Sequence, residues 1–305
     1  MPLFPTYEVN GVPMQDAAGR WHEHPKMQVL PAHPGLRVNA MVLSGLDGET
    51  YVGRSPLEPQ VFTLKLVVNS VNESGVKPRT PGEQLAQMQR NMDALYRAFQ
   101  VPRMTGNGLA RIKMRLSATE SRFADALMIG SVDVDREPWV DHAEVSFVFR
   151  ISSGKWRGLQ TSQRIVTTDS PFGHRGVVPG LKWSTAPIND ALITISGSFD
   201  WMQIMNEFTE GFRYDNHIDV RQAVTINTRT WKATDPYPMA SGADFATIPS
   251  SGQFKYCPYL SQVGEATGSA LILWPKEDGA TIYAHGDGRT PGSTYCYVDT
   301  REAFI

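Results

Sequence analysis

Alternating apolar and polar positions recur along this chain and predict strands far more often than helices. The clearest case is the run FTLKLVVNS at 62–70, where a period of two with β-branched residues is typical of a half-buried strand. One face of that run carries Phe62, Leu64, Leu66 and Val68. The same alternation predicts further strands over 109–118, 126–134 and 144–152.

A single segment of the first half has helical spacing instead. Thr80 and Glu83 fit a capping box, with Pro81 at the first helical position. Apolar residues then follow at intervals of three and four: Leu85, Met88, Met92, Leu95 and Phe99. The pattern predicts one long helix over 80–100, ending before Pro102 because proline disfavours helical geometry in the residue before it.

The periodicity lapses between 153 and 180, where Gly, Pro, Ser and Thr dominate and only 163–166 favours a short strand. We therefore expect a domain boundary near Thr161, which gives a first domain of 1–160 and a second of 161–305. The 305-residue length suits two domains, and 41% hydrophobic residues allow each a core.

The second half reads as a series of short strands with turns between them. Strands are expected over 192–199, 223–231, 269–274, 281–284 and 293–300. Turn chemistry comes from Asp278-Gly279, Asp287-Gly288 and Pro291-Gly292, so the spacing favours a β-sandwich. The segment 201–210 is predicted to form one or two helical turns. The fold class is thus mainly β, with two sandwich domains.

Charge argues against nucleic acid and membrane partners. Lys and Arg number 29 and Asp and Glu 31, a net charge of -2, whereas those partners favour a concentrated basic surface. Arg111, Lys113 and Arg115 alternate along one strand, but no aromatic residue is interleaved, which favours a solvated strand face. No apolar run approaches the ~20 residues of a membrane span, and no secretory signal is visible, so we expect synthesis in the cytoplasm.

Candidate chemistry is sparse. Cys257 and Cys296 are expected to be reduced thiols, with a single disulfide as the alternative. His22, His24 and His33 have no acidic or thiol cluster to complete a metal site, so we expect neither metal nor cofactor. Nucleophile-elbow, Walker A and dinucleotide motifs are missing from the sequence. Acidic residues that a hydrolase could use occur at Glu207, Glu210, Asp215 and Asp219.

Aromatic residues crowd the second half and raise the possibility of sugar stacking. The candidates are Trp231, Tyr237, Phe254 and Tyr256. The alternative is that these rings pack in the core. The first 60 residues contain eight prolines and predict either an arm that reaches a neighbouring subunit or an irregular N-terminus.

The order of these elements resembles the distal tail and minor tail protein family of siphophages, particularly those that infect actinobacteria. The resemblance is carried by the FTLKLVV strand, the helix, the basic strand, Lys155-Trp156, Trp274-Pro275 and a last strand with Arg301. The residues of the helix pattern are Arg79, Pro81, Leu85, Asn91, Leu95 and Phe99. The resemblance implies a belt domain, which is a β-sandwich with one helix, and then a galectin-like sandwich.

The resemblance also implies a function without catalysis. Such proteins form a ring, usually a hexamer, that joins the tail tube to the tail tip and its receptor-binding parts. Expected partners are other copies of the chain and the tail tube, tape measure and tail tip or baseplate proteins, in a virion tail assembled in the host cytoplasm. Edge pairing by the strand of Phe62, Leu64, Leu66 and Val68 is the expected subunit contact. The alternatives are a carbohydrate-binding module and a tail-associated hydrolase.

Overall fold

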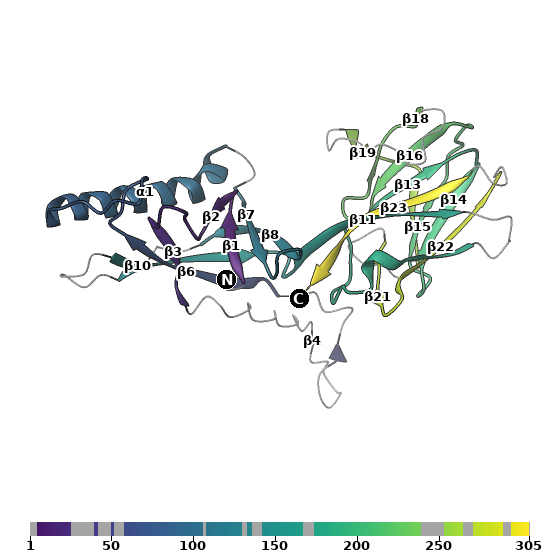
Figure 1. Ribbon diagram of the computed structural model, residues 1–305. Coiled ribbons are helices and arrows are strands. Elements are labelled where there is room, and N and C mark those ends of the chain that lie inside the picture. Colours follow the sequence, from purple (N-terminus) through teal and green to yellow (C-terminus); the bar gives the residue numbers. More distant parts are fainter. Residues whose placement is uncertain are drawn as a thin grey trace. The chain divides into compact units, whose positions relative to one another are not determined.

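The computed structural model describes residues 5–25, 40–41, 50–51, 58–105, 108–129, 133–135, 142–166, 174–238, 253–264, 271–288 and 294–304. The chain divides into two units, 1–157 and 158–304, and strands make up most of the regular structure in both (Figure 1). The prediction of a mainly β fold with one long helix is therefore confirmed. His33 and the Pro291-Gly292 turn lie outside the described residues.

Unit 1 contains one helix and several antiparallel strands. They are β1 (Thr6–Val9), β2 (Val12–Pro13), β3 (Trp21–Glu23), β4 (Ala40–Met41), β5 (Thr50–Tyr51), β6 (Gln60–Asn69), α1 (Pro81–Thr105), β7 (Ala110–Arg115), β8 (Ser121–Met128), β9 (Asp133–Asp135) and β10 (His142–Ile151). β6 lies between β10 and β3, β8 continues the sheet beside β10, and β7 and β1 follow β8. β4 and β5 pair only with each other in the described part of the chain.

The alternation seen in the sequence fills the core of unit 1. In β10 the side chains of Val145, Phe147, Phe149 and Ile151 are buried. α1 covers this core, with the Phe99 ring 4.4 Å from the Phe147 ring in an edge-on arrangement. Leu85 is 45% exposed, so the buried stripe of the helix begins at Met88.

The capping box of α1 forms as predicted, but the helix end does not. The Glu83 N–H donates to Thr80 Oγ1 and the Thr80 N–H to Glu83 Oε2, each at 3.3 Å. The helix runs through Pro102 to Thr105, so the predicted stop is wrong. Proline lacks the N–H that would bond to the carbonyl of Ala98. The side-chain amide of Asn10 donates to that carbonyl at 2.8 Å instead.

Unit 2 has two antiparallel sheets. Its elements are β11 (Trp156–Val166, which begins in unit 1), β12 (His174–Val178), a 3-10 turn (Pro179–Leu181), β13 (Leu192–Ser196), β14 (Trp201–Asn206), β15 (Gly211–Tyr214), β16 (Gln222–Asn227), β17 (Lys232–Ala233), β18 (Tyr237–Pro238), β19 (Lys255–Tyr256), β20 (Leu260–Val263), β21 (Pro275–Lys276), β22 (Gly279–Asp287) and β23 (Tyr295–Phe304). One sheet has the order β19-β17-β16-β13-β23-β11, with β18 beside β16. The other has the order β12-β22-β14-β15-β20, with β21 beside β22.

Three sequence predictions fail in this unit. In place of the strand expected over 269–274, the described residues 271–274 form only an isolated bridge between Leu273 and Ile188. The lapse of pattern at 153–180 hides β12 and most of β11, of which only 163–166 is expected as a strand, because their sheet partners compensate for a weak local signal. The expected helical turns at 201–210 are a β-hairpin, because Met202 and Ile204 enter the core on alternate positions while Trp201, Gln203 and Met205 stay half-buried. A turn at Asn206–Glu210 then reverses the chain, with Thr209 at φ 60°.

Candidate functional site

The four aromatic residues predicted to stack on sugars lie on or beside short strands of the β16 sheet. Trp231 occupies the turn before β17 with φ 56°, and Tyr256 in β19 is 82% exposed. The Tyr237 hydroxyl lies 2.9 Å from Thr225 Oγ1, within a buried hydroxyl network that includes Thr194. Phe254, just before β19, is half-buried. Tyr237 is thus held against its sheet while Tyr256 points to solvent, and sugar binding by this set stays a prediction.

The four side chains named for the expected subunit contact of β6 face the core of unit 1, and edge pairing by this strand stays a prediction. Phe62, Leu64, Leu66 and Val68 are at most 4% exposed and belong to the core of unit 1. Phe62 packs 5.1 Å from the Tyr7 ring. Any subunit contact by β6 must therefore use its backbone edge or its opposite face, on which Val61 is 59% exposed.

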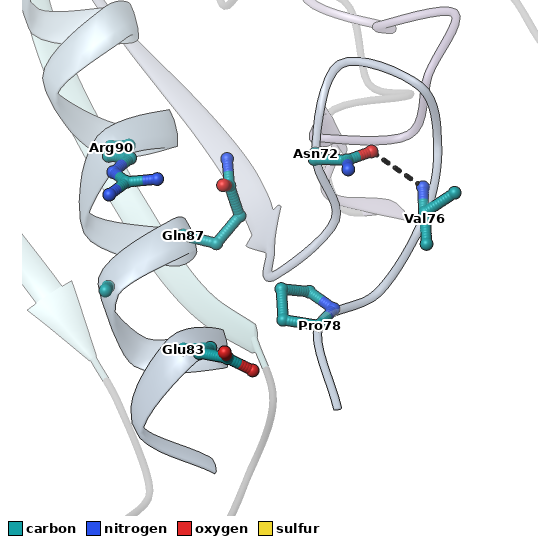
Figure 2. Close-up of a pocket in the computed structure, with 7 residues that line it drawn as sticks. Asn72, Val76, Pro78, Glu83, Gln87 and Arg90 are labelled. Carbon is teal, nitrogen blue, oxygen red and sulfur yellow. Dashed lines mark hydrogen bonds between the residues drawn. The ribbon is translucent and has the colours of Figure 1, made fainter. Parts of the chain in front are cut away.

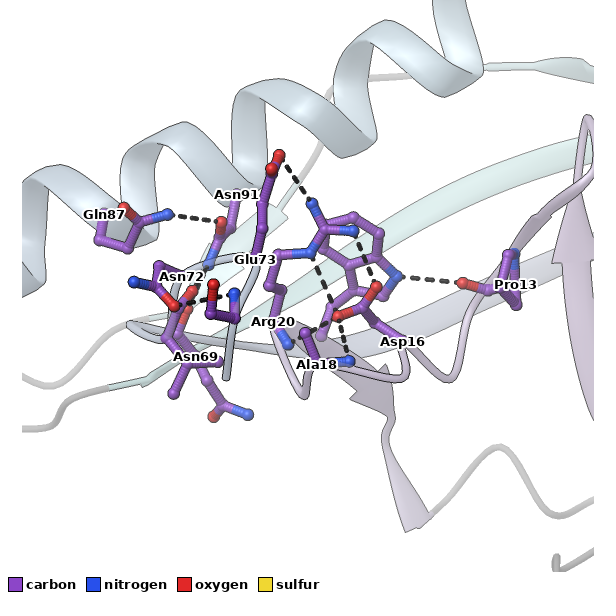
Figure 3. A network of polar contacts seen from close by, with 12 residues as sticks. Pro13, Asp16, Ala18, Arg20, Asn69, Asn72, Glu73, Gln87 and Asn91 are labelled. Atoms are coloured by element: carbon purple, nitrogen blue, oxygen red, sulfur yellow. Dashed lines mark hydrogen bonds and ion pairs between the residues drawn. The ribbon is translucent and has the colours of Figure 1, made fainter. Parts of the chain in front are cut away.

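A polar network fixes the loops of unit 1 beside α1 (Figure 3). Asp16 accepts from the backbone N–H groups of Ala18 and Arg20 at 3.1 Å and pairs with the Arg20 guanidinium at 2.8 Å. The same guanidinium lies 4.4 Å from the centre of the Trp21 ring. The Asp16 carboxylate is held in its ionised form by these donors, which lower its pKa although burial opposes this.

Asn91 ties the β6–α1 loop, residues 70–79, to the helix. Its side chain is 3% exposed, and its amide donates to the carbonyls of Asn69 and Val71 at 2.8 Å each. Gln87 donates to the Asn91 side-chain oxygen at 3.0 Å. Within the loop, Asn72 Oδ1 accepts from the backbone of Val76 at 2.9 Å. These bonds give the loop one fixed conformation.

The fixed loop and the start of α1 enclose an open pocket of about 380 Å³ (Figure 2). Loop residues form one wall and the helix the other: Asn72, Val76, Pro78, Glu83, Ala86, Gln87 and Arg90. The lining mixes one acid, one base, two amides and three small apolar groups. Such a lining suits a protein contact better than a small apolar ligand, which needs a more enclosed and hydrophobic cavity.

A half-buried carboxyl links β3 to β1 in unit 1. Glu23, at the end of β3, accepts from the Tyr7 backbone N–H at 2.6 Å. Burial raises its pKa to about 7, although the N–H of Tyr7 acts in the opposite direction. On the other face of β3, burial together with His142 and His24 lowers the pKa of His22. The described residues contain no group of three His, Cys, Asp or Glu that could hold a metal ion.

The other chemical candidates have structural partners. Cys257 and Cys296 are free thiols, and burial raises the pKa of Cys296 to about 12. The carboxylates considered for a hydrolase each engage a different group, since Glu207 pairs with Lys276, Glu210 with Asn206, Asp215 with Arg213 and Asp219 with His217. These pairings favour structural roles for the four acids.

The three basic residues of the strand face predicted from β7 all pair with acids. Arg111 pairs with Asp125 at 3.0 Å, while Lys113 and Arg115 both pair with Glu8, at 3.4 Å and 2.6 Å. This supports a solvated strand face over a nucleic-acid stripe. No helix among the described residues is long and apolar enough to cross a membrane.

Comparison with known proteins gives a likeness in structure only. No protein-family model matches the chain, and neither does any curated protein. The fold is similar to that of the Dit (gp 19.1) protein of SPP1, described as a paradigm of the hub of the adsorption apparatus in phages that infect Gram-positive bacteria. The two are 9% identical, with a TM-score of 0.55 over 99% of this chain and 100% of that one.

Two further structures belong to the baseplate of phage P2 in its activated conformation, with Ca or with Sr. Both are 10% identical to this chain and cover 99% of it and 100% of the baseplate chain, with TM-scores of 0.38 and 0.36. The SPP1 likeness runs through both units, so the predicted resemblance to distal tail proteins is confirmed at the level of the fold.

Proposed function

We propose that this chain is a structural protein of a phage tail tip, where copies of it form a ring, a hexamer, that joins the tail tube to the tip. The observation that carries this proposal is the fold shared with SPP1 Dit, a hub protein, over 99% of the chain. The similarity to SPP1 Dit is not confined to one domain. It includes the helix-containing domain and the second β-sandwich, in the same order. The role needs no catalysis, in keeping with the paired carboxylates of unit 2.

The solvent-facing side of the β6–β10–β8 sheet supplies the subunit contact in this proposal. Arg150 in β10 lies in register with Val61 on one side and Leu127 on the other. Val61 is 59% exposed and Leu127 38% exposed, which places two aliphatic side chains around one cation. A contact of this patch with a different surface of the next subunit is heterologous, and such a contact forms a ring when its rotation closes after a whole number of subunits.

The remaining partners follow from position in the tail. In this proposal the ring contacts the tail tube protein, the tape measure protein and the tail tip or baseplate proteins, and it assembles in the host cytoplasm. The N-terminal arm expected to reach a neighbouring subunit lies largely outside the described residues, and its contact with a neighbour is part of the proposal.

Native mass spectrometry and electron microscopy of the purified chain, alone and co-expressed with its tube protein, test the ring. We expect six-fold particles, and we expect Val61→Glu to yield monomers by placing a charge in the patch. Val76→Glu is the matched control, because Val76 is also a valine of unit 1 with 59% exposure. A monomeric parent in both preparations would refute the ring. If the six-fold particles form with Val61→Glu but not with Val76→Glu, the subunit contact lies at the pocket beside α1 and not at Val61.

A further inference from the structure

The outer face of the six-stranded sheet of unit 2 carries a row of hydrogen-bonding side chains. Gln203 in β14 lies in register with Arg213 in β15 on one side and with His285 in β22 on the other. Ser261 in β20 continues the row beyond Arg213. Four neighbouring strands therefore place an amide, a guanidinium, an imidazole and a hydroxyl in one line, which we name the Gln203 row.

The row faces outward because alternate residues of the same strands fill the core. Met202 and Ile204 of β14 are 0% exposed, as are Phe212 of β15 and Ala284 of β22. Since side chains alternate along a strand, Gln203, Arg213 and His285 lie on the opposite face.

Aromatic side chains border the Gln203 row on both sides. Trp201 precedes it on β14, with its ring centre 5.1 Å from that of His285 in an edge-on arrangement. Tyr283 and Met205, which lie in register with each other, form the next row on the other side. Rings beside planar polar groups offer both an apolar surface and directed hydrogen bonds.

The charge of this face is balanced and its central cation is held in place. The Arg213 guanidinium lies 4.1 Å from the centre of the Trp201 ring, and its Nε donates to Asp215 Oδ1 at 2.7 Å. Stacking and pairing hold the Arg213 side chain in one rotamer, so less side-chain conformational entropy is lost when a ligand binds. Because Asp215 compensates Arg213, the face has no excess positive charge to select an anion.

We propose that the Gln203 row and the rings beside it bind a neutral saccharide. Vicinal sugar hydroxyls are both donors and acceptors. They match the imidazole of His285, the exposed part of the Arg213 guanidinium and the Gln203 amide, whose Nε2 donates to Met205 Sδ at 2.8 Å and whose oxygen can accept from a hydroxyl. The apolar face of a pyranose matches Trp201 or Tyr283. A flat protein partner is less well matched, because the face centres on polar groups, whereas the middle of a protein interface is apolar. This site is distinct from the ring contact of unit 1.

A glycan array with neutral, sulfated and phosphorylated oligosaccharides, probed with the full chain, identifies the ligand class. Fluorescence titration with the strongest neutral hit then compares the parent with Gln203→Ala and His285→Ala. Loss of one neutral hydrogen bond weakens binding by roughly two- to tenfold, so we expect about tenfold or more for the double variant. Tyr256→Ala and Trp231→Ala are the controls and are expected to bind within about twofold of the parent, since neither residue lies on this face.

Each result decides between this site and its rivals. Neutral glycan binding that is lost in the double variant and kept in Tyr256→Ala, with unchanged thermal unfolding, supports the proposal. No binding to any neutral glycan, binding to charged glycans alone, or loss of binding in Tyr256→Ala would overturn it. The native mass of each variant shows whether the substitution changes the oligomeric state, which distinguishes a loss of sugar binding from a loss of ring assembly. A ring that disperses on Gln203→Ala would show that the face is a subunit contact and not a sugar site.

Discussion

Replacement of Asn91 by Ala is the most direct test of how unit 1 fixes its loops. The substitution removes two donated bonds of 2.8 Å, to the carbonyls of Asn69 and Val71, and one bond of 3.0 Å accepted from Gln87. The side chain is 3% exposed, so water cannot readily replace the lost donors. The β6–α1 loop then loses its attachment to the helix.

The magnitude follows from these contacts. Each unsatisfied carbonyl costs about 1–3 kcal/mol when buried, and the lower end applies here because both carbonyls are partly accessible. Alanine regains about 0.7 kcal/mol of helix propensity over asparagine. The net loss is about 1.3 kcal/mol, which lowers the unfolding temperature of a unit this size by about 3–5 °C.

Differential scanning calorimetry of the full chain measures this shift. Gln89→Ala is the control, because Gln89 lies on the exposed side of the same helix and makes one bond of 2.9 Å to Asp93, worth under about 0.5 kcal/mol. Asn91→Asp should be worse than Asn91→Ala at pH 7, because a carboxylate would face two carbonyl oxygens. That difference should shrink as the pH falls and the acid gains a proton to donate. If Asn91→Ala shifts unfolding no more than Gln89→Ala does, the loop is held by something else.

Two further predictions concern single contacts of unit 1. Because the pKa of Glu23 is raised to about 7 in the folded chain, its contribution to stability is present at pH 4 and is lost as the pH rises through about 7, so the unfolding temperature should fall over that range. Glu23→Gln should flatten this dependence, and an unchanged slope in thermal melts would contradict the assignment. Asn10→Ala should lower the free energy of unfolding, measured in urea, by about 1–2 kcal/mol, because the Ala98 carbonyl then has no hydrogen-bond donor. Pro102→Ala restores that donor, so the cost of Asn10→Ala should be smaller in the Pro102→Ala background; equal costs would refute the compensation.

The features predicted correctly are those whose signal is local. β6 and β10 were evident because alternation over ten residues each leaves one face to bury. The start of α1 was evident because a capping box needs only Thr80 and Glu83. Its end was mispredicted because proline is a local stop signal, whereas the donor that compensates for it, on Asn10, lies 88 residues away from Ala98 in sequence.

The second unit shows the same limit more strongly. At 201–206 the residues W-M-Q-I-M-N alternate only weakly, and the partner strands β15 and β22 decide that the segment is a strand. The clustering of aromatic residues in the second half of the sequence pointed to Trp231 and Tyr256 as sugar-binding residues. A period of two through Trp201, Gln203 and Met205 was the one sequence signal for the Gln203 row.

By itself the sequence determined that this protein is mainly β, with one capped helix, a balanced charge and no catalytic motif, because periodicity, capping and composition are properties of neighbouring residues. Only the tertiary structure decided which residues of different strands meet outside the core. Gln203, Arg213, Ser261 and His285 come from four different strands and form a row through strand register. Register depends on pairing between distant segments, which no local pattern encodes.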